Sequence, residues 1–240
     1  ERKKRETASP ASFTWENLKS HKIKTITGWT GSVASKKRIL SKLRKTADWR
    51  AKLFAQITPK HQHAAALCAL TGARPSEIAR GVCVELAGDG DGMRLVITIA
   101  GSKITANSGQ PSRTIRVKID TDEARHLAEH AANAPIHVVT HPANLCAAFI
   151  KAGRAAFPHL QETVTPYVLR HALASDLKAA GISPDAIAQV LGHQASESQQ
   201  AYGFAVCASG PVSIDGVRAA LAVRSTHRRP REHLGISSPT

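Results

Sequence analysis

The sequence predicts a mainly α-helical fold with a small antiparallel β-sheet. Three runs, at 81–87, 93–100 and 112–119, have the composition of strands, and the second and third alternate in polarity and are rich in β-branched residues. A glycine-rich turn at 88–92 joins the first two runs and indicates a hairpin. The patterns on both sides of these runs are mostly helical, so the expected class is α+β.

Helices are expected ahead of the strands. Residues 32–50 place their apolar side chains near one face of a helix and basic side chains on the others. Residues 61–70 are an alanine-rich apolar segment, which ends at Gly72. Pro75 then opens a short helix, because proline is well tolerated in the first helical turn.

More helical segments follow the strands. They are 121–132, 141–155, 165–180, 184–191, a short one around 196–203, and a short helix in the apolar part of the tail at 213–223. Thr121, Thr165 and Ser183 stand at helix starts, where a side-chain oxygen can cap free backbone N–H groups. Gly181 and Gly192 mark helix ends.

Positive charge is concentrated at the start of the chain. Residues 1–60 hold 16 Lys and Arg against 4 Asp and Glu, or +12 of the net +15, whereas the remaining 180 residues hold 17 against 14. A basic arm on a nearly neutral body favours nucleic acid as the partner over general solubility. We interpret the basic residues of the helix at 32–50 as contacts to a DNA backbone rather than a merely solvated face: Lys36, Lys37, Arg38, Lys42, Arg44 and Lys45.

Cysteine usage and hydropathy indicate a cytoplasmic protein. Without a C-x-x-C pair, the cysteines are expected to be reduced and mostly buried: Cys68, Cys83, Cys146 and Cys207. No apolar run approaches the length of a membrane span, and no signal peptide is recognisable. Since the chain begins with Glu1 and its one methionine is Met93, we expect a piece of a longer protein.

The chemistry-bearing residues gather in one block near the carboxyl end. It reads Tyr167-Val-Leu-Arg170-His171, then Leu-Gly-His193, then Gln-Gln-Ala-Tyr202, with both tyrosines of the chain at its ends. Arginine, histidine and tyrosine are separated by 23 and then 9 positions (170 to 193, 193 to 202). A guanidinium for a phosphate, an imidazole beside it and a phenol that could attack form a coherent set.

Two further boxes lie upstream in the expected order. Arg74 and Glu77 stand in Thr-Gly-Ala-Arg-Pro-Ser-Glu, and Lys103 follows the second strand run in Ala-Gly-Ser-Lys. Over about residues 60–203, the ordered set resembles the tyrosine recombinases, or phage-type integrases. The resemblance implies the catalytic-domain fold of that family, with Lys103 on a hairpin and Glu77 supporting Arg74.

The resemblance also implies a role for each of the other residues. Tyr202 would attack the scissile phosphorus and form a 3′-phosphotyrosyl link, leaving a free 5′-hydroxyl. Arg74 and Arg170 would hold the phosphate and offset its charge in the transition state. Lys103 would donate the proton to the leaving oxygen, and His193 would hydrogen-bond the phosphate. No metal or energy cofactor is implied, because the arginines supply the charge stabilisation.

Tyr167 departs from the family pattern. The box usually written His-x-x-Arg begins here with a tyrosine, whose phenol can donate a hydrogen bond but is a poor general base near pH 7. His193 is therefore expected to carry more of the proton removal from Tyr202. His171 is not expected to replace the missing imidazole, because it is adjacent to Arg170 and neighbouring helical positions point in different directions.

Partners and domain limits follow from the same resemblance. Double-stranded DNA would be bound by a tetramer on paired sites, near the nucleoid, by a catalytic domain at 53–204. Residues 1–52 would be a basic arm or linker, the end of a truncated DNA-binding domain, so this piece is expected to be monomeric when free. The tail at 205–240, with its short helix, would dock on a neighbouring protomer or equally pack back onto its own domain. Its apolar face is formed by Ile214, Val217 and Leu221.

Other interpretations stay open. A catalytically silent DNA-binding regulator would keep the basic arm, and Tyr167 favours it slightly. A type IB topoisomerase would share the chemistry without needing a specific site. A helical interaction module unrelated to DNA would show DNA affinity that is absent or insensitive to salt.

Short motifs elsewhere carry less weight. His126-Leu-Ala-Glu129-His130 fits an inverted zinc-protease motif on a helix, but no third ligand is evident, and exposed side chains are the preferred interpretation. The glycine-rich turn at 88–92 lacks the terminal glutamate of a calcium loop, so calcium is rejected.

Overall fold

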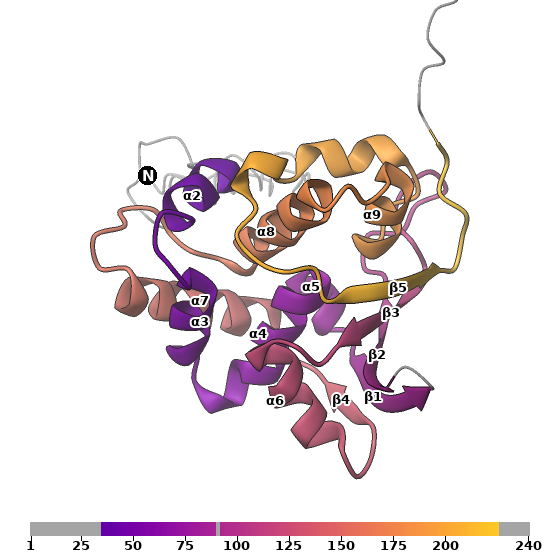
Figure 1. Cartoon of the computed structure of the whole chain (residues 1–240), viewed down its shortest axis with the longest axis horizontal. Helices are drawn as coiled ribbons and strands as arrows, with labels where there is room; N and C mark the ends of the chain where they lie inside the picture. Colours follow the sequence, from indigo (N-terminus) through magenta and orange to yellow (C-terminus); the bar gives the residue numbers. More distant parts are fainter. Residues whose placement is uncertain (1–34, 90–91, 226–240) are drawn as a thin grey trace, which may run out of the picture. The chain divides into compact units, whose positions relative to one another are not determined.

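The structure, a computed structural model, is a mixed α+β fold with a small antiparallel sheet, as the sequence predicts (Figure 1). It describes residues 35–89 and 92–225, which belong to one compact unit. Most of the predicted basic arm (1–34), the middle of the glycine-rich turn (90–91) and the basic end of the chain (226–240) lie outside the described residues. Within the described ranges, no helix is long and apolar enough to cross a membrane.

The helix predicted over 32–50 is instead two helices, α2 (Lys36–Leu43) and α3 (Trp49–Ala55). α2 ends at Leu43, and after a short turn the chain enters α3 through Asp48, whose φ of 50° lies in the left-handed region. Aspartate tolerates this conformation better than most residues, because its short side chain can hydrogen-bond locally. The apolar periodicity correctly predicts the buried face of α2 but does not reveal this turn.

The next two helices confirm the prediction and lead into the candidate site. They are α4 (Pro59–Thr71) and the short α5 (Pro75–Ile78). Gly72 ends α4 with a φ of 63°, and a Cβ atom there would lie 3.2 Å from the Leu191 side chain and 3.3 Å from that of Leu173. The left-handed backbone and the close approach both favour glycine. This turn fixes the point from which Arg74 enters the interior.

Among the described residues, the sheet has five antiparallel strands in the order β4-β1-β2-β3-β5. β1 (Val82–Asp89), β2 (Gly92–Ala100) and β3 (Ser112–Lys118) confirm the three predicted runs, and β1 and β2 form the predicted hairpin. The short edge strand β4 (Ile136–Val138) was not predicted. It pairs with β1, a partner more than forty positions away that no local pattern reveals.

The tail corrects the prediction of a short helix. Its apolar part forms β5 (Ile214–Ala219), which pairs with β3 and covers that strand's free edge. Further along the tail, an isolated β-bridge pairs Arg224 with Ala195. The described part of the tail, up to residue 225, therefore packs on its own domain, one of the two arrangements that its apolar face allowed.

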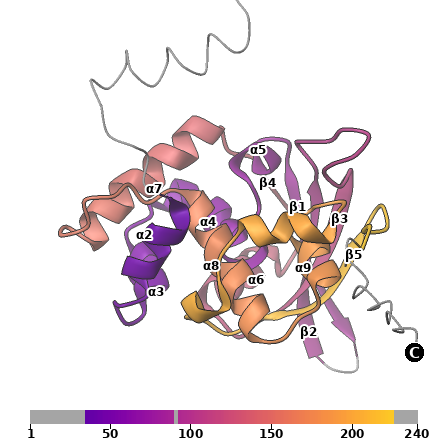
Figure 2. The ribbon, with the colours of Figure 1, turned by 90° about the horizontal axis from the view of Figure 1, so that it is seen from above.

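One face of the sheet is the core face. Its buried side chains are Val82, Val84, Leu95, Ile97, Ile99, Ile115 and Val117. They alternate along each strand, as expected when one face is covered. α6 (Asp122–Ala131) packs against β1 and β2, and α9 (Pro184–Val190) packs against β3 and β5. Figure 2 shows the strands grouped on one side of the molecule and the helices on the other.

The remaining helices surround α8 (Pro166–Ala179), which is buried along most of its length and packs against α2 and α4. α7 (Pro142–Ala156) precedes it and confirms the segment predicted at 141–155. The short helix predicted around 196–203 is a 3₁₀ helix, η1 (Ser196–Ala201), and a second one, η2 (Ala205–Cys207), follows. Tyr202 lies between these two short helices, in extended backbone.

Candidate active site

Arg74 and Glu77 form a buried ion pair at the start of α5. Nη1 of Arg74 donates to Oε1 of Glu77 at 2.6 Å, and the backbone N–H of Arg74 donates to Oε2 at 2.8 Å. The same carboxylate thus satisfies a free backbone donor at the helix start and fixes the guanidinium three residues before it. Glu77 is fully buried and Arg74 is 8% exposed.

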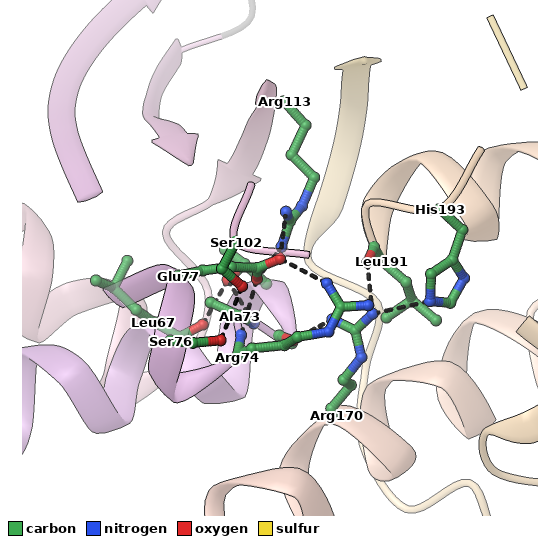
Figure 3. Close-up of polar contacts among 12 residues, drawn as sticks. Leu67, Ala73, Arg74, Ser76, Glu77, Ser102, Arg113, Arg170, Leu191 and His193 are labelled. Atoms are coloured by element: carbon green, nitrogen blue, oxygen red, sulfur yellow. Dashed lines mark hydrogen bonds and ion pairs between the residues drawn. The ribbon is translucent and has the colours of Figure 1, made fainter. Parts of the chain in front are cut away.

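Arg113 is a third member of this cluster, and the sequence analysis missed it. From β3, its Nη2 and Nη1 donate to the two oxygens of Glu77 at 2.9 and 3.2 Å (Figure 3). A signal was present in the sequence: Arg113 has the same strand parity as Ile115 and Val117, so it belongs to the buried face. An arginine in register with buried side chains indicates a buried partner of opposite charge.

Glu77 is held as a carboxylate. Burial raises its pKa, but the adjacent Arg113 and Arg74 guanidinium groups outweigh that effect and bring the pKa down to about 2. Arg74 in turn has a raised pKa: burial lowers it, and attraction to Glu77 more than compensates.

Arg170 comes from α8 and is almost fully buried. Its Nη1 donates to the carbonyl of Gly72 at 2.7 Å, and its Nη2 donates to the carbonyl of Leu191 at 2.5 Å (Figure 3). Burial, followed by repulsion from Arg74, lowers its pKa to about 10, so the group still carries its charge at neutral pH. The two carbonyls orient the guanidinium without neutralising it.

His193 lies beside Arg170, directly after the turn at Gly192. Its Nε2 lies 3.0 Å from Nη2 of Arg170 and accepts from it, which places the proton of the neutral ring on Nδ1. That Nδ1 is buried and has no hydrogen-bond partner among the described residues. Burial and the charges of Arg170 and Arg74 lower the pKa of His193 to about 3. At neutral pH the ring is therefore an uncharged donor and a weak base.

Tyr202 meets both site arginines. Burial raises the pKa of its phenol, but the charges of Arg170 and Arg74 bring it below the ordinary value. The Arg170 guanidinium lies 4.7 Å from the Tyr202 ring centroid, and the rings of His193 and His171 lie at 5.4 and 5.0 Å. The structure thus brings together the arginines of two separate boxes, the histidine of the third and the tyrosine.

Tyr167 lies at the edge of the same cluster. It is half-buried; burial raises the pKa of its phenol, while Arg74 and Arg170 are near enough for their charges to act against that rise. No hydrogen bond joins its hydroxyl to another described residue. The hydroxyl is therefore free to donate to a ligand.

Lys103 is not brought into the cluster. It lies in the connection between β2 and β3, is exposed, and has no hydrogen bond or ion pair with another described residue. The preceding residue is nevertheless tied to the site, because the hydroxyls of Ser102 and Ser76 lie 2.8 Å apart, and Ser76 is on α5 (Figure 3). The loop is anchored next to Arg74, and its lysine extends into solvent.

Two residues of α8 that the sequence analysis did not assign hold the segment around Tyr202. Nζ of Lys178 donates to the carbonyls of Gln199, Tyr202 and Gly203 at 3.1, 2.8 and 2.8 Å. The backbone N–H of Gly203 donates to Nδ1 of His171 at 3.1 Å. His171 therefore binds the backbone beside Tyr202, so its position next to Arg170 has a use that the sequence analysis did not predict.

The basic residues of α2 contact this same segment. Lys37 donates to the carbonyl of Gln200 at 3.2 Å and lies 4.1 Å from the ring centroid of Phe204, while Arg44 donates to the carbonyl of Val206 at 2.8 Å. Two further residues of the predicted DNA-binding set also pack against the protein. Lys42 pairs with Glu162, and Lys36 is half-buried. Arg38 and Lys45 are exposed. Four of the six basic residues thus have structural contacts that the prediction of a DNA-binding face did not include.

The arrangement is suited to binding an anion. Among the described residues of the cluster, Arg74 and Arg113 hydrogen-bond the carboxylate of Glu77, whereas the guanidinium of Arg170 binds two backbone carbonyls and has no carboxylate partner. Buried positive charge without a matching counter-ion is costly, and a phosphate would offset it. Comparison of the chain with protein-family models and with curated proteins gives no match.

Proposed function

We propose that the protein is a tyrosine recombinase that cleaves and rejoins duplex DNA through a 3′-phosphotyrosyl intermediate. The observation that carries the proposal is the position of Tyr202 beside Arg170, whose guanidinium lies 4.7 Å from its ring centroid, and close enough to Arg74 that both charges lower the pKa of the phenol. These arginines come from α5 and α8, nearly a hundred positions apart in the chain. A phenol with a lowered pKa between two phosphate-binding groups is what a nucleophile for a phosphodiester requires.

In the proposed reaction, Oη of Tyr202 attacks the scissile phosphorus and the bond to the 5′-oxygen breaks. Arg74 and Arg170 donate hydrogen bonds to the non-bridging oxygens, where negative charge accumulates. The phenol loses one proton and the 5′-oxygen gains one. Lys103 would supply the latter, once DNA draws the loop between β2 and β3 towards the cluster. Religation reverses these steps.

His193 acts as a donor in this scheme. Its Nδ1–H is buried and has no partner among the described residues, so it would donate to a phosphate oxygen once the ring turns towards the DNA, whereas its depressed pKa makes it a poor acceptor for the phenol proton. The arginines already favour the phenolate, so the proton can pass to solvent. Tyr167 would add a hydrogen bond to the phosphate. No step needs a metal or an energy cofactor, because the guanidinium groups supply the charge stabilisation.

The proposal extends to fold and assembly. The mixed α+β architecture would be the catalytic-domain fold of the recombinases, with duplex DNA along the face that carries Tyr202. We further propose a tetramer on paired DNA sites, in a cytoplasmic protein associated with the nucleoid and with a mobile genetic element. The exposed Arg38 and Lys45 are the members of the predicted basic set best placed to meet a DNA backbone.

Supercoiled plasmids separate the proposed function from its rivals. One plasmid carries two copies of the ends of the genetic element that encodes the chain, and a second carries unrelated sequence. A recombinase gives recombined products from the first plasmid, and the Tyr202→Phe variant gives none. Relaxation of both plasmids alike would indicate a topoisomerase. Salt-sensitive binding without any strand exchange or relaxation would indicate a silent regulator and contradict the proposal.

A further inference from the structure

Three histidines from two helices converge away from the candidate active site. His63 is on α4, and His126 and His130 are on α6. One ring nitrogen from each can be chosen so that all three lie within 4.8 Å of one another. The ring centroids form a nearly equilateral triangle, with separations of 4.8, 4.5 and 4.6 Å.

The packing of α4 against α6 supplies what the sequence motif lacks. His126 and His130 are four residues apart, so they lie on one face of α6. That motif alone offers two ligands, which gave little reason to expect a metal. The two helices pack together, and α4 brings His63 to the same point as a third. Three histidines with an open position are a common protein ligand set for zinc.

The rings are also prepared for coordination. Nδ1 of His130 lies 2.8 Å from the carbonyl of His126 and donates to it, which leaves Nε2 of His130 unprotonated. Nε2 of His126 is buried and has no hydrogen-bond partner among the described residues.

We propose that His63, His126 and His130 bind one Zn²⁺ ion, with water at the fourth position. Tetrahedral Zn–N bonds of about 2.0–2.1 Å place ligand nitrogens about 3.3 Å apart. The three nitrogens, which lie within 4.8 Å of one another, therefore have to approach by up to about 1.5 Å. His130 is exposed and the other two are half-buried, so side-chain rotation and entry of the ion are both possible. The ion would join α4 to α6.

The zinc site takes no part in the proposed recombinase chemistry. It would affect that chemistry only by stabilising the fold that positions the candidate active site. α4 ends at Thr71, immediately before the turn that places Arg74 and Glu77. A metal that joins α4 to α6 binds only the folded state, so it stabilises the fold by mass action.

Zinc binding to tag-free protein tests the proposal. The chain is treated with EDTA, transferred to metal-free buffer and titrated with ZnCl₂ in competition with a chromophoric chelator, and bound zinc is measured by atomic emission. We expect one zinc per chain and a higher melting temperature with zinc. Substitution of a ligand, as in His63→Gln or His130→Gln, is expected to weaken binding by about tenfold or more. A tetrahedral Co²⁺ absorption spectrum should accompany cobalt binding.

His61→Gln is the matched control, because His61 is also on α4 but outside the cluster, with its Nδ1 near the Thr58 hydroxyl. It should bind zinc like the unsubstituted chain. His130 is exposed, so His130→Gln should keep the fold, as far-UV circular dichroism will show. Less than stoichiometric zinc on the unsubstituted chain, or a folded His130→Gln protein with unchanged zinc affinity, overturns the proposal.

Discussion

At the scale of single residues, Glu77 supplies the counter-charge for two buried arginines. It accepts hydrogen bonds from Arg74 and Arg113, and none of the three side chains is more than 9% exposed. Glu77→Gln would leave two buried guanidinium groups without their counter-charge. We expect the free energy of unfolding to fall by about 3–5 kcal/mol, measured by urea denaturation.

Asp122→Asn is the matched control for that substitution. Asp122 pairs with Arg125 at 2.7 Å on the surface of α6, and both side chains are more than half exposed. The loss there should be below about 1 kcal/mol. Equal losses in the two variants would contradict the assignment of Glu77 as the buried centre of the cluster.

His193 gives a second prediction, on the pH dependence of stability. Its pKa is about 3 in the folded protein against an ordinary value of 6.5, so on acidification the unfolded chain takes up the proton first. Stability is therefore complete above about pH 6.5 and falls as the pH drops towards 3. His171, with a pKa lowered by burial to about 4, acts in the same direction.

Urea denaturation at several pH values between 7 and 4 measures this effect. His193→Gln should flatten the fall in the free energy of unfolding, because glutamine takes up no proton in the unfolded state. Parallel pH profiles for the two proteins would show that His193 is not held neutral.

At the scale of elements, α8 positions the Tyr202 segment through Lys178. Lys178→Met removes the three hydrogen bonds to backbone carbonyls and keeps the aliphatic part of the side chain. We expect phosphotyrosyl complex formation to fall by about tenfold or more, because misplacing a reactive group by about 1 Å can cost a factor of 100. DNA affinity, measured by fluorescence anisotropy, should stay the same.

Lys151→Met on α7 is the control, since Lys151 is exposed and has no hydrogen bond or ion pair with another described residue. It should leave both DNA affinity and complex formation unchanged. A Lys178→Met protein that reacts as fast as the unsubstituted chain would show that the segment needs no such anchor.

The helices and strands show which features local sequence patterns can predict. Helix starts at Thr121 and Ser183 were predicted from capping side chains, and their hydroxyls do accept from backbone N–H groups. β5 and β4 could not be predicted, because each is short and depends on a strand far away in the sequence. The turn at Asp48 was missed because it breaks a helical pattern without glycine or proline.

At the scale of the whole molecule, the boxes named from sequence do converge. Arg74, Arg170, His193 and Tyr202 could be predicted because residue type, order and spacing carried the signal. The loop that carries Lys103 is anchored next to the cluster, but the Lys103 side chain is exposed. The position of Lys103 in a loop could not indicate whether its side chain would reach the cluster.

Contacts between distant elements explain the residues that were missed. Arg113 and Lys178 take their roles from partners 36 and more than 20 positions away. His63 joins the two other histidines only because α4 and α6 pack together. Tertiary packing assigns these roles, and a local pattern cannot show it.

Covalent trapping on nicked duplexes shows directly whether Tyr202 is the nucleophile. The nick lies next to the scissile phosphate, so the short strand with the free 5′-hydroxyl diffuses away and the protein stays attached to DNA. Substrates come from the ends of the genetic element that encodes the chain. A denaturing gel measures the complex, and mass spectrometry of the digested product identifies the linked residue.

We expect a covalent complex joined through Tyr202, absent in Tyr202→Phe and reduced only modestly in Tyr167→Phe. Modest reduction is expected because Tyr167 supplies a hydrogen bond and not the nucleophile. A complex that still forms in Tyr202→Phe, or one whose DNA is attached to another residue, would show that Tyr202 is not the nucleophile.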